Sequence, residues 1–116
     1  MLLDSDRNRL RHMVQAAEQA VEYACRRTIE EVENAPPLQH LFLRNLEIIG
    51  EAASRISPEL RAAHPEIPWR DMMDMRNRLI RAYFDIDMEI VWRTIREALP
   101  ELICQLRTVL DAESRS

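Results

Sequence analysis

The chain has 116 residues, a net charge of −4, one glycine and six prolines. A chain of this length forms one domain with a hydrophobic core, so we expect a single domain over residues 1–116. No apolar run approaches the roughly 20 residues of a membrane span, and the polar start differs from a signal peptide. These features argue against membrane insertion and predict a cytoplasmic protein. The acidic balance also argues against broad binding to nucleic acid.

The first predicted helix begins near Asp4 to Asp6, which can cap it, and runs to about Asn34. Apolar and small residues recur along it at spacings of four and three, the pattern of a helix packed in a bundle. These residues are Leu10, Val14, Ala17, Val21, Ala24 and Thr28. Pro36-Pro37 then ends this helix and starts the next one.

The second predicted helix runs from about Leu38 to Ile56. One stripe along it is expected to face the core. It consists of Phe42, Asn45, Ile49, Ala52 and Ile56. Gly50 lowers helix stability by roughly 1 kcal/mol relative to alanine, and we interpret it as a point of close helix contact and not as a hinge.

The second half of the chain is divided by prolines. Ser57-Pro58 predicts a short capped helix, and Pro68 begins a longer one over residues 69–84. Residues 85–87 form a turn and a new cap, and a further helix runs from 88 to 99. Pro100 is expected to kink or break it before the helical pattern resumes to about residue 112, leaving a frayed tail over 113–116. The sequence therefore predicts an all-α, up-and-down bundle of four to five helices.

The helix over 69–84 places an arginine in the middle of an apolar stripe. At 100° per residue, the stripe is centred on Arg76. Its members are Trp69, Met72, Met73, Leu79, Ile80 and Tyr83. A buried guanidinium is costly unless it is paired or lies at a wet cleft. Two interpretations follow: a structural arginine held by Glu47 or Glu51, or a functional arginine at a cleft.

Charge is also uneven at this helix. Four arginines and two aspartates give residues 69–84 a charge of +2, so the rest of the chain carries −6. A basic site on an acidic body suits a phosphate ligand met at one cleft. We therefore assign Arg70 and Arg78 to phosphate binding beside Arg76.

Residues 76–83 (RNRLIRAY) resemble the signature of HEPN-domain ribonuclease toxins of the HepT group, which reads Arg, four residues, His, any residue, Tyr. The chain matches at Arg76 and Tyr83 and departs at Arg81, where the family has histidine. Residues 43–52 and 64–70 are also similar to HepT-like proteins. The likeness extends roughly from residue 5 to 112.

The resemblance implies a HEPN-like bundle that dimerises and acts as a metal-independent endoribonuclease. In the family the histidine takes the proton of the ribose 2′-hydroxyl, and the arginine stabilises charge on the scissile phosphate. Positions 76 and 81 lie about 140° apart on a helix, so motifs from two subunits of a homodimer are expected to line one cleft. Asn77 is a supporting candidate that would orient the phosphate, with a surface amide as the alternative.

Arg81 changes the chemistry that the resemblance implies. A guanidinium is not deprotonated in proteins and cannot act as the base, although it can still bind phosphate. We therefore expect the chain to bind RNA, with Arg70 and Arg78 as RNA-binding residues, but to cleave it poorly or not at all. The substitution is either an inactivating change in an active toxin or a feature of a degenerate family member.

The resemblance also implies a partner. In this family the motif tyrosine, here Tyr83, accepts AMP from a nucleotidyltransferase antitoxin of the MntA kind. The alternative for Tyr83 is a core aromatic with its hydroxyl at the rim. Two rival functions stay open: a non-catalytic helical adaptor that binds a partner or nucleotide, and a structural dimeric bundle.

Other chemistries have no support in the sequence. The residues three before His12, His40 and His64 are not glutamates, so the Glu-x-x-His pairs of di-iron bundles are missing. There is no His/Cys cluster with zinc spacing, and a single glycine cannot build a phosphate-binding loop. The sequence therefore predicts neither a metal site nor a cofactor.

Overall fold

The computed structural model describes residues 3–81 and 87–114, and these contain helices but no strand. The elements are α1 (Asp4–Ala24), α2 (Ile29–Glu33), α3 (Pro36–Arg55), α4 (Pro58–Ala63), α5 (Trp69–Arg81), α6 (Met88–Arg93), the π-helical η1 (Thr94–Ala98) and α7 (Leu99–Ser114). The predicted all-α fold is confirmed.

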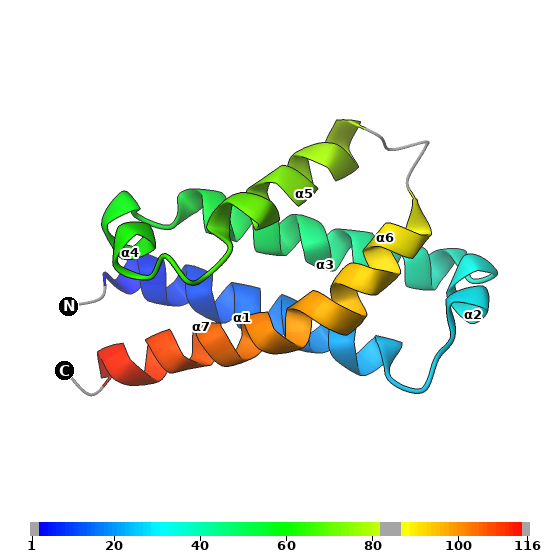
Figure 1. Cartoon of the computed structure of the whole chain (residues 1–116), viewed down its shortest axis with the longest axis horizontal. Coiled ribbons are helices and arrows are strands. Elements are labelled where there is room, and N and C mark those ends of the chain that lie inside the picture. Colours follow the sequence, from blue (N-terminus) through cyan, green and yellow to red (C-terminus); the bar gives the residue numbers. More distant parts are fainter. Residues whose placement is uncertain (1–2, 82–86, 115–116) are drawn as a thin grey trace.

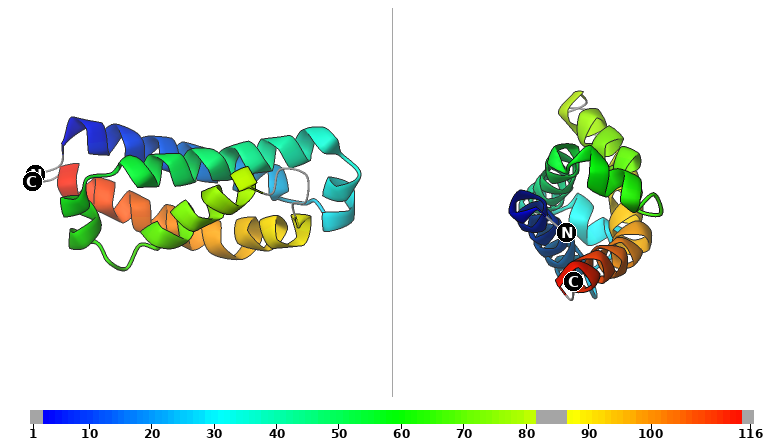
Figure 2. Two further views of the ribbon diagram at one scale, coloured as in Figure 1. Left: turned by 90° about the horizontal axis from the view of Figure 1, so that it is seen from above. Right: turned by 90° about the vertical axis from the view of Figure 1, so that its left-hand side faces the viewer.

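The long helices lie side by side as an up-and-down bundle (Figure 1). Helix α1 packs between α3 and α7, and α5 packs on the other side of α3. Helices α6, η1 and α7 follow one another as one rod, and the short α2 and α4 lie at opposite ends (Figure 2). The start of α1 and the end of α7 therefore lie at the same end of the bundle.

The core is formed by the faces that the sequence pattern predicted. All five residues of the stripe predicted on the second helix are buried, four on α3 and Ile56 directly after it. Leu10 and Leu106 are fully buried on α1 and α7. On α5, Trp69, Met72 and Leu79 are buried, which fixes the face that α5 presents to α3. No helix among the described residues is long and apolar enough to cross a membrane.

The first helix is shorter than predicted. It ends at Ala24, because Arg26 adopts a left-handed backbone conformation with a φ of 66°. Thr28 then caps α2, its hydroxyl accepting a hydrogen bond from the Glu31 backbone N–H at 3.2 Å. A threonine followed three residues later by glutamate is a capping signal. Because this local signal prevails over the apolar spacing, Thr28 caps α2 and does not extend the apolar stripe of α1.

The predicted capping of α1 by Asp4 to Asp6 is also wrong. The cap residue is Leu3, with no side-chain hydrogen bond. Asp6 is buried and accepts hydrogen bonds from the Ser57 backbone N–H and hydroxyl at 3.0 and 2.6 Å. Its carboxylate thereby connects the start of α1 to the cap of α4.

Pro100 does not break the last helix. The irregularity lies one turn earlier, where η1 takes the wider π form and α7 continues through Pro100. Proline has no N–H to donate and its ring crowds the preceding turn. A π turn accommodates both effects without ending the helix.

Candidate functional site

The position of Arg76 depends on close packing between α3 and α5. A Cβ atom added to Gly50 would overlap the Cβ of Arg76 and come within 2.7 Å of the Met72 carbonyl oxygen. The interpretation of Gly50 as a close helix contact is confirmed. Without a side chain at Gly50, the backbone of α5 approaches α3 at Arg76, which places the guanidinium directly beside the next turn of α3.

The Arg76 guanidinium is held by three side chains. One terminal nitrogen, Nη1, donates to the Glu51 carboxylate and, at 3.4 Å, to the Ser54 hydroxyl. The other, Nη2, donates to the Asn77 amide oxygen at 3.1 Å. Nε is buried and has no hydrogen-bond partner. Of the alternatives left open by the sequence, Glu51 is the paired carboxylate and Glu47 is not.

Glu51 is shared between two arginines. It accepts from Arg55 Nε at 2.7 Å and also pairs with Arg76. The hydrogen bond from Arg55, followed by that from Arg76, holds the pKa of the Glu51 carboxyl below its ordinary value of 4.5. The side chain of Glu51 is 47% exposed and that of Arg76 is 22% exposed. The ion pair therefore lies at the wall of a wet cleft and not in the sealed core.

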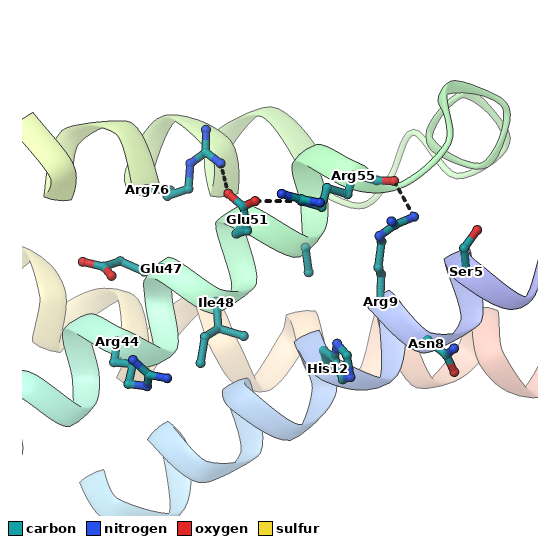
Figure 3. A pocket seen from close by; sticks show the side chains of 11 residues that line it. Ser5, Asn8, Arg9, His12, Arg44, Glu47, Ile48, Glu51, Arg55 and Arg76 are labelled. Atoms are coloured by element: carbon teal, nitrogen blue, oxygen red, sulfur yellow. Dashed lines mark hydrogen bonds and ion pairs between the residues drawn. The ribbon is translucent and has the colours of Figure 1, made fainter.

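An open cleft of about 620 Å³ borders this pair, between α1, α3 and α5 (Figure 3). We call it the arginine cleft. Its charged lining consists of Arg9, Arg44, Arg55, Arg76, Glu47 and Glu51, with His12 on the α1 side. Arg9 also donates from Nη1 to the Arg55 carbonyl oxygen at 3.1 Å and so joins α1 to the end of α3. Clustered guanidinium groups are typical of sites for phosphate or carboxylate.

The structure brings together only some of the predicted site residues. Arg76 lines the cleft. Asn77 contacts Arg76, whose guanidinium donates a hydrogen bond to the Asn77 amide oxygen. Arg70 and Arg78 are exposed on α5 but do not line the cleft. Arg81 is the last described residue of α5, and its side chain lies outside the described part of the chain, as does Tyr83. The RNA-binding assignment of Arg70 and Arg78 stays a prediction.

Sequence reasoning named Glu47 and Glu51 on α3, but it did not find the other cleft residues on α3 or the wall that α1 forms. Arg44, Glu51 and Arg55 follow a helical spacing of seven and four, which places them on one face of α3. Arg9 and His12 share a face of α1 in the same way. These patterns were readable, but they also describe an ordinary solvated helix face, and only the packing of α1, α3 and α5 shows that they meet.

Similarity to known proteins decides the family. The profile of the family described as "Ribonuclease HepT-like" matches residues 13–109, most of the chain. The chain belongs to the HepT-like ribonuclease family. The matched segment covers α3 and α5, and therefore Glu51 and Arg76, whereas Arg9 and His12 precede it.

Curated relatives of this HepT-like protein carry ribonuclease names. A protein of Caldanaerobacter subterraneus subsp. tengcongensis, named "Putative RNase TTE0752", is 36% identical over 104 residues, which are 90% of this chain and 93% of the relative. A protein of Thermococcus cleftensis, named "Probable ribonuclease HepT", is 48% identical over 64 residues, 55% of this chain and 58% of the relative. No solved structure is a significant match to the chain.

Proposed function

We propose that this HepT-like protein is the toxin component of a type VII-like toxin–antitoxin pair, located in the cytoplasm. In the proposed active form, two subunits form a homodimer and cleave RNA without metal through the motif Arg76, position 81 and Tyr83. The nucleophile is the ribose 2′-oxygen. It attacks the adjacent phosphorus as its proton leaves, the bond to the 5′-oxygen breaks, and that oxygen takes up a proton. The products are a 2′,3′-cyclic phosphate and a free 5′-hydroxyl.

The position of the Arg76 guanidinium, at the wall of the arginine cleft, supports this proposal most directly. An arginine has five N–H donors, and the hydrogen bonds to Glu51, Ser54 and Asn77 engage three of them. An Nη2 proton remains for a phosphate oxygen. Because Asn77 and Glu51 fix the plane of the guanidinium, little ordering entropy would be lost when phosphate binds.

Because arginine replaces histidine at position 81, this chain binds RNA but cuts it poorly. Imidazole titrates near neutral pH and suits general-base catalysis, whereas a guanidinium does not release its proton. Phosphate binding by Arg76, with Arg70 and Arg78 on the exposed side of α5, does not require the histidine. Loss of the base alone lowers the rate roughly 10²–10⁴-fold.

Restoring the histidine tests the proposal. We expect Arg81→His, expressed alone, to arrest growth and to produce RNA fragments with 5′-hydroxyl ends, at a rate roughly 10²–10⁴-fold above the natural chain. In the Arg81→His background, Arg76→Ala should abolish cleavage. Arg93→Ala, which removes an exposed arginine paired with Glu89 on α6, should not. Normal growth and intact RNA with histidine at 81 would contradict the catalytic assignment.

A second candidate is a non-catalytic adaptor that binds a partner or nucleotide through the same cleft. The pairing of Arg76 with Glu51 is compatible with it, because an arginine without a catalytic role makes the same contact. RNA binding by the natural chain that is lost in Arg76→Ala, without cleavage after Arg81→His, would support this adaptor function.

A further inference from the structure

A second groove continues the arginine cleft along α1 and α3. It has a volume of about 410 Å³, within the range of roughly 300–1,000 Å³ for small-molecule sites. It is lined by His12, Gln15, Ala16, Gln19, Asn45 and Ile48. We call it the amide groove. His12 and Ile48 line both the amide groove and the arginine cleft, so a ligand bound at the arginines can extend into the amides.

Asn45 is the residue of this groove whose environment indicates a ligand. Only 3% of it is exposed, and its Nδ2 atom is buried without a hydrogen-bond partner. A buried donor left unpaired costs about 1–3 kcal/mol. A leucine at this position in the α3 stripe would avoid that cost. The asparagine therefore suits a groove whose occupant supplies the missing acceptor.

The rest of the lining suits a nucleobase. Gln15 and Gln19 are exposed and, among the described residues, the structure shows no hydrogen bond from either side chain. The other two glutamines of the chain, Gln39 and Gln105, both donate to backbone carbonyls. Free amides pair with the edges of bases, His rings stack on base faces, and Ile48 adds an apolar surface.

We propose that the amide groove is a base-binding subsite for the nucleotide whose phosphate binds in the arginine cleft. The inference rests on the proposed function and adds a substrate preference to it. A side-chain amide presents a donor beside an acceptor, which matches N6–H and N7 of adenine. Guanine offers two acceptors on the corresponding edge, N7 and O6, and suits arginine instead. The groove therefore selects adenine over guanine.

Mononucleotides test the subsite because they carry one phosphate and one base. With the natural chain, adenosine 3′-monophosphate should bind about ten-fold more tightly than guanosine 3′-monophosphate or inorganic phosphate, as one good base contact predicts. Gln19→Leu and Asn45→Leu should each reduce adenosine 3′-monophosphate affinity toward that of inorganic phosphate and leave inorganic phosphate binding unchanged. Gln105→Leu on α7 is the matched control and should bind like the natural chain.

Thermal unfolding separates a binding role of Asn45 from a structural one. If Asn45 is kept for a ligand, Asn45→Leu should unfold at the same or a higher temperature than the natural chain without ligand, since an unpaired buried donor is removed. Equal affinity for adenosine and guanosine 3′-monophosphates, or unchanged binding in both leucine variants, would overturn the subsite while leaving the ribonuclease proposal standing. Failure of the natural chain to bind any phosphate, with RNA intact after Arg81→His, would overturn the proposed function itself.

Discussion

At the scale of single residues, Glu51 fixes the geometry of the arginine cleft. It pairs with Arg76 from α5 and with Arg55 one turn further along α3. The sequence left open whether Arg76 is structural or functional, and it offered Glu47 or Glu51 as the carboxylate that would pair with a structural arginine. It could not choose between them, because the longitudinal register between two helices depends on where their backbones approach, and here that point is set by Gly50.

The lowered pKa of Glu51 predicts a pH dependence of stability. A carboxyl whose folded pKa lies below its unfolded value stabilises the fold fully above the unfolded value, and the stabilisation disappears as pH falls through the folded pKa. For Glu51 the unfolded value is 4.5, and hydrogen bonds from Arg55 and Arg76 lower the folded one. The melting temperature of the natural chain should therefore exceed that of Glu51→Gln at pH 6 to 7, and the difference should shrink below about pH 4.5.

Thermal melts of both proteins across this pH range provide the measurement. The size of the difference at neutral pH should be small, because half-exposed ion pairs are screened by solvent. A difference that does not change between pH 7 and pH 3 would mean that the carboxylate charge does not stabilise the fold.

At the scale of elements, α5 is positioned by the absence of a side chain on α3. In an isolated helix, Gly50→Ala would stabilise by roughly 1 kcal/mol. In this structure the added methyl group would overlap Arg76 and the Met72 carbonyl, and overpacking of this kind costs roughly 1–3 kcal/mol.

We therefore expect Gly50→Ala to unfold at a lower denaturant concentration than the natural chain, and to bind phosphate more weakly because α5 must move away from α3. Urea unfolding and phosphate titration measure the two effects. A variant that gains stability and binds as before would show that α3 and α5 can separate at Gly50 without cost.

The elements also show where sequence patterns compete. Apolar spacing predicted one helix to about Asn34, yet the Thr28–Glu31 capping signal begins a new helix after the left-handed Arg26. The buried stripe of α3 was readable because apolar periodicity dominates in long amphipathic helices. The end of α1 and the start of α2 were not, because they depend on the left-handed backbone of Arg26 and on one hydrogen bond to the Thr28 hydroxyl.

At the scale of the whole molecule, the bundle followed from the sequence but the cleft did not. Proline positions and apolar periods predicted the antiparallel long helices that Figure 1 shows. The cleft needs α1, α3 and α5 to meet, so Arg9 and His12 could be placed beside Arg76 only by tertiary packing. The HepT-like resemblance was stated on residues 43–52, 64–70 and 76–83, and it proposed a role for Arg76 but gave none to α1.

The proposed partner is tested on the intact protein. With a nucleotidyltransferase antitoxin and ATP, we expect the mass to rise in steps of AMP, as the Tyr83 oxygen attacks the α-phosphate and pyrophosphate leaves. Tyr83→Phe should block the increase. Tyr23→Phe, which alters the other tyrosine of the chain, 40% exposed on α1, should not. Each added AMP brings negative charge, which should weaken RNA binding in a gel-shift assay.

Modification of Tyr23 in place of Tyr83 would contradict the acceptor residue. No mass increase with an active transferase would contradict this partner and favour the adaptor function.

The two glutamates of the cleft have a consequence for nucleic-acid binding in general. Four guanidinium groups and the carboxylates of Glu47 and Glu51 line the same cleft, so part of its positive charge is neutralised before a ligand binds. A phosphate bound at the free Nη2 proton of Arg76 meets a guanidinium whose positive charge Glu51 already partly neutralises, so each contact gains little net charge. Affinity should then fall only gently with ionic strength. Such a cleft should bind polyanions without bases only weakly, and it should hold an RNA strand chiefly where a base also fits.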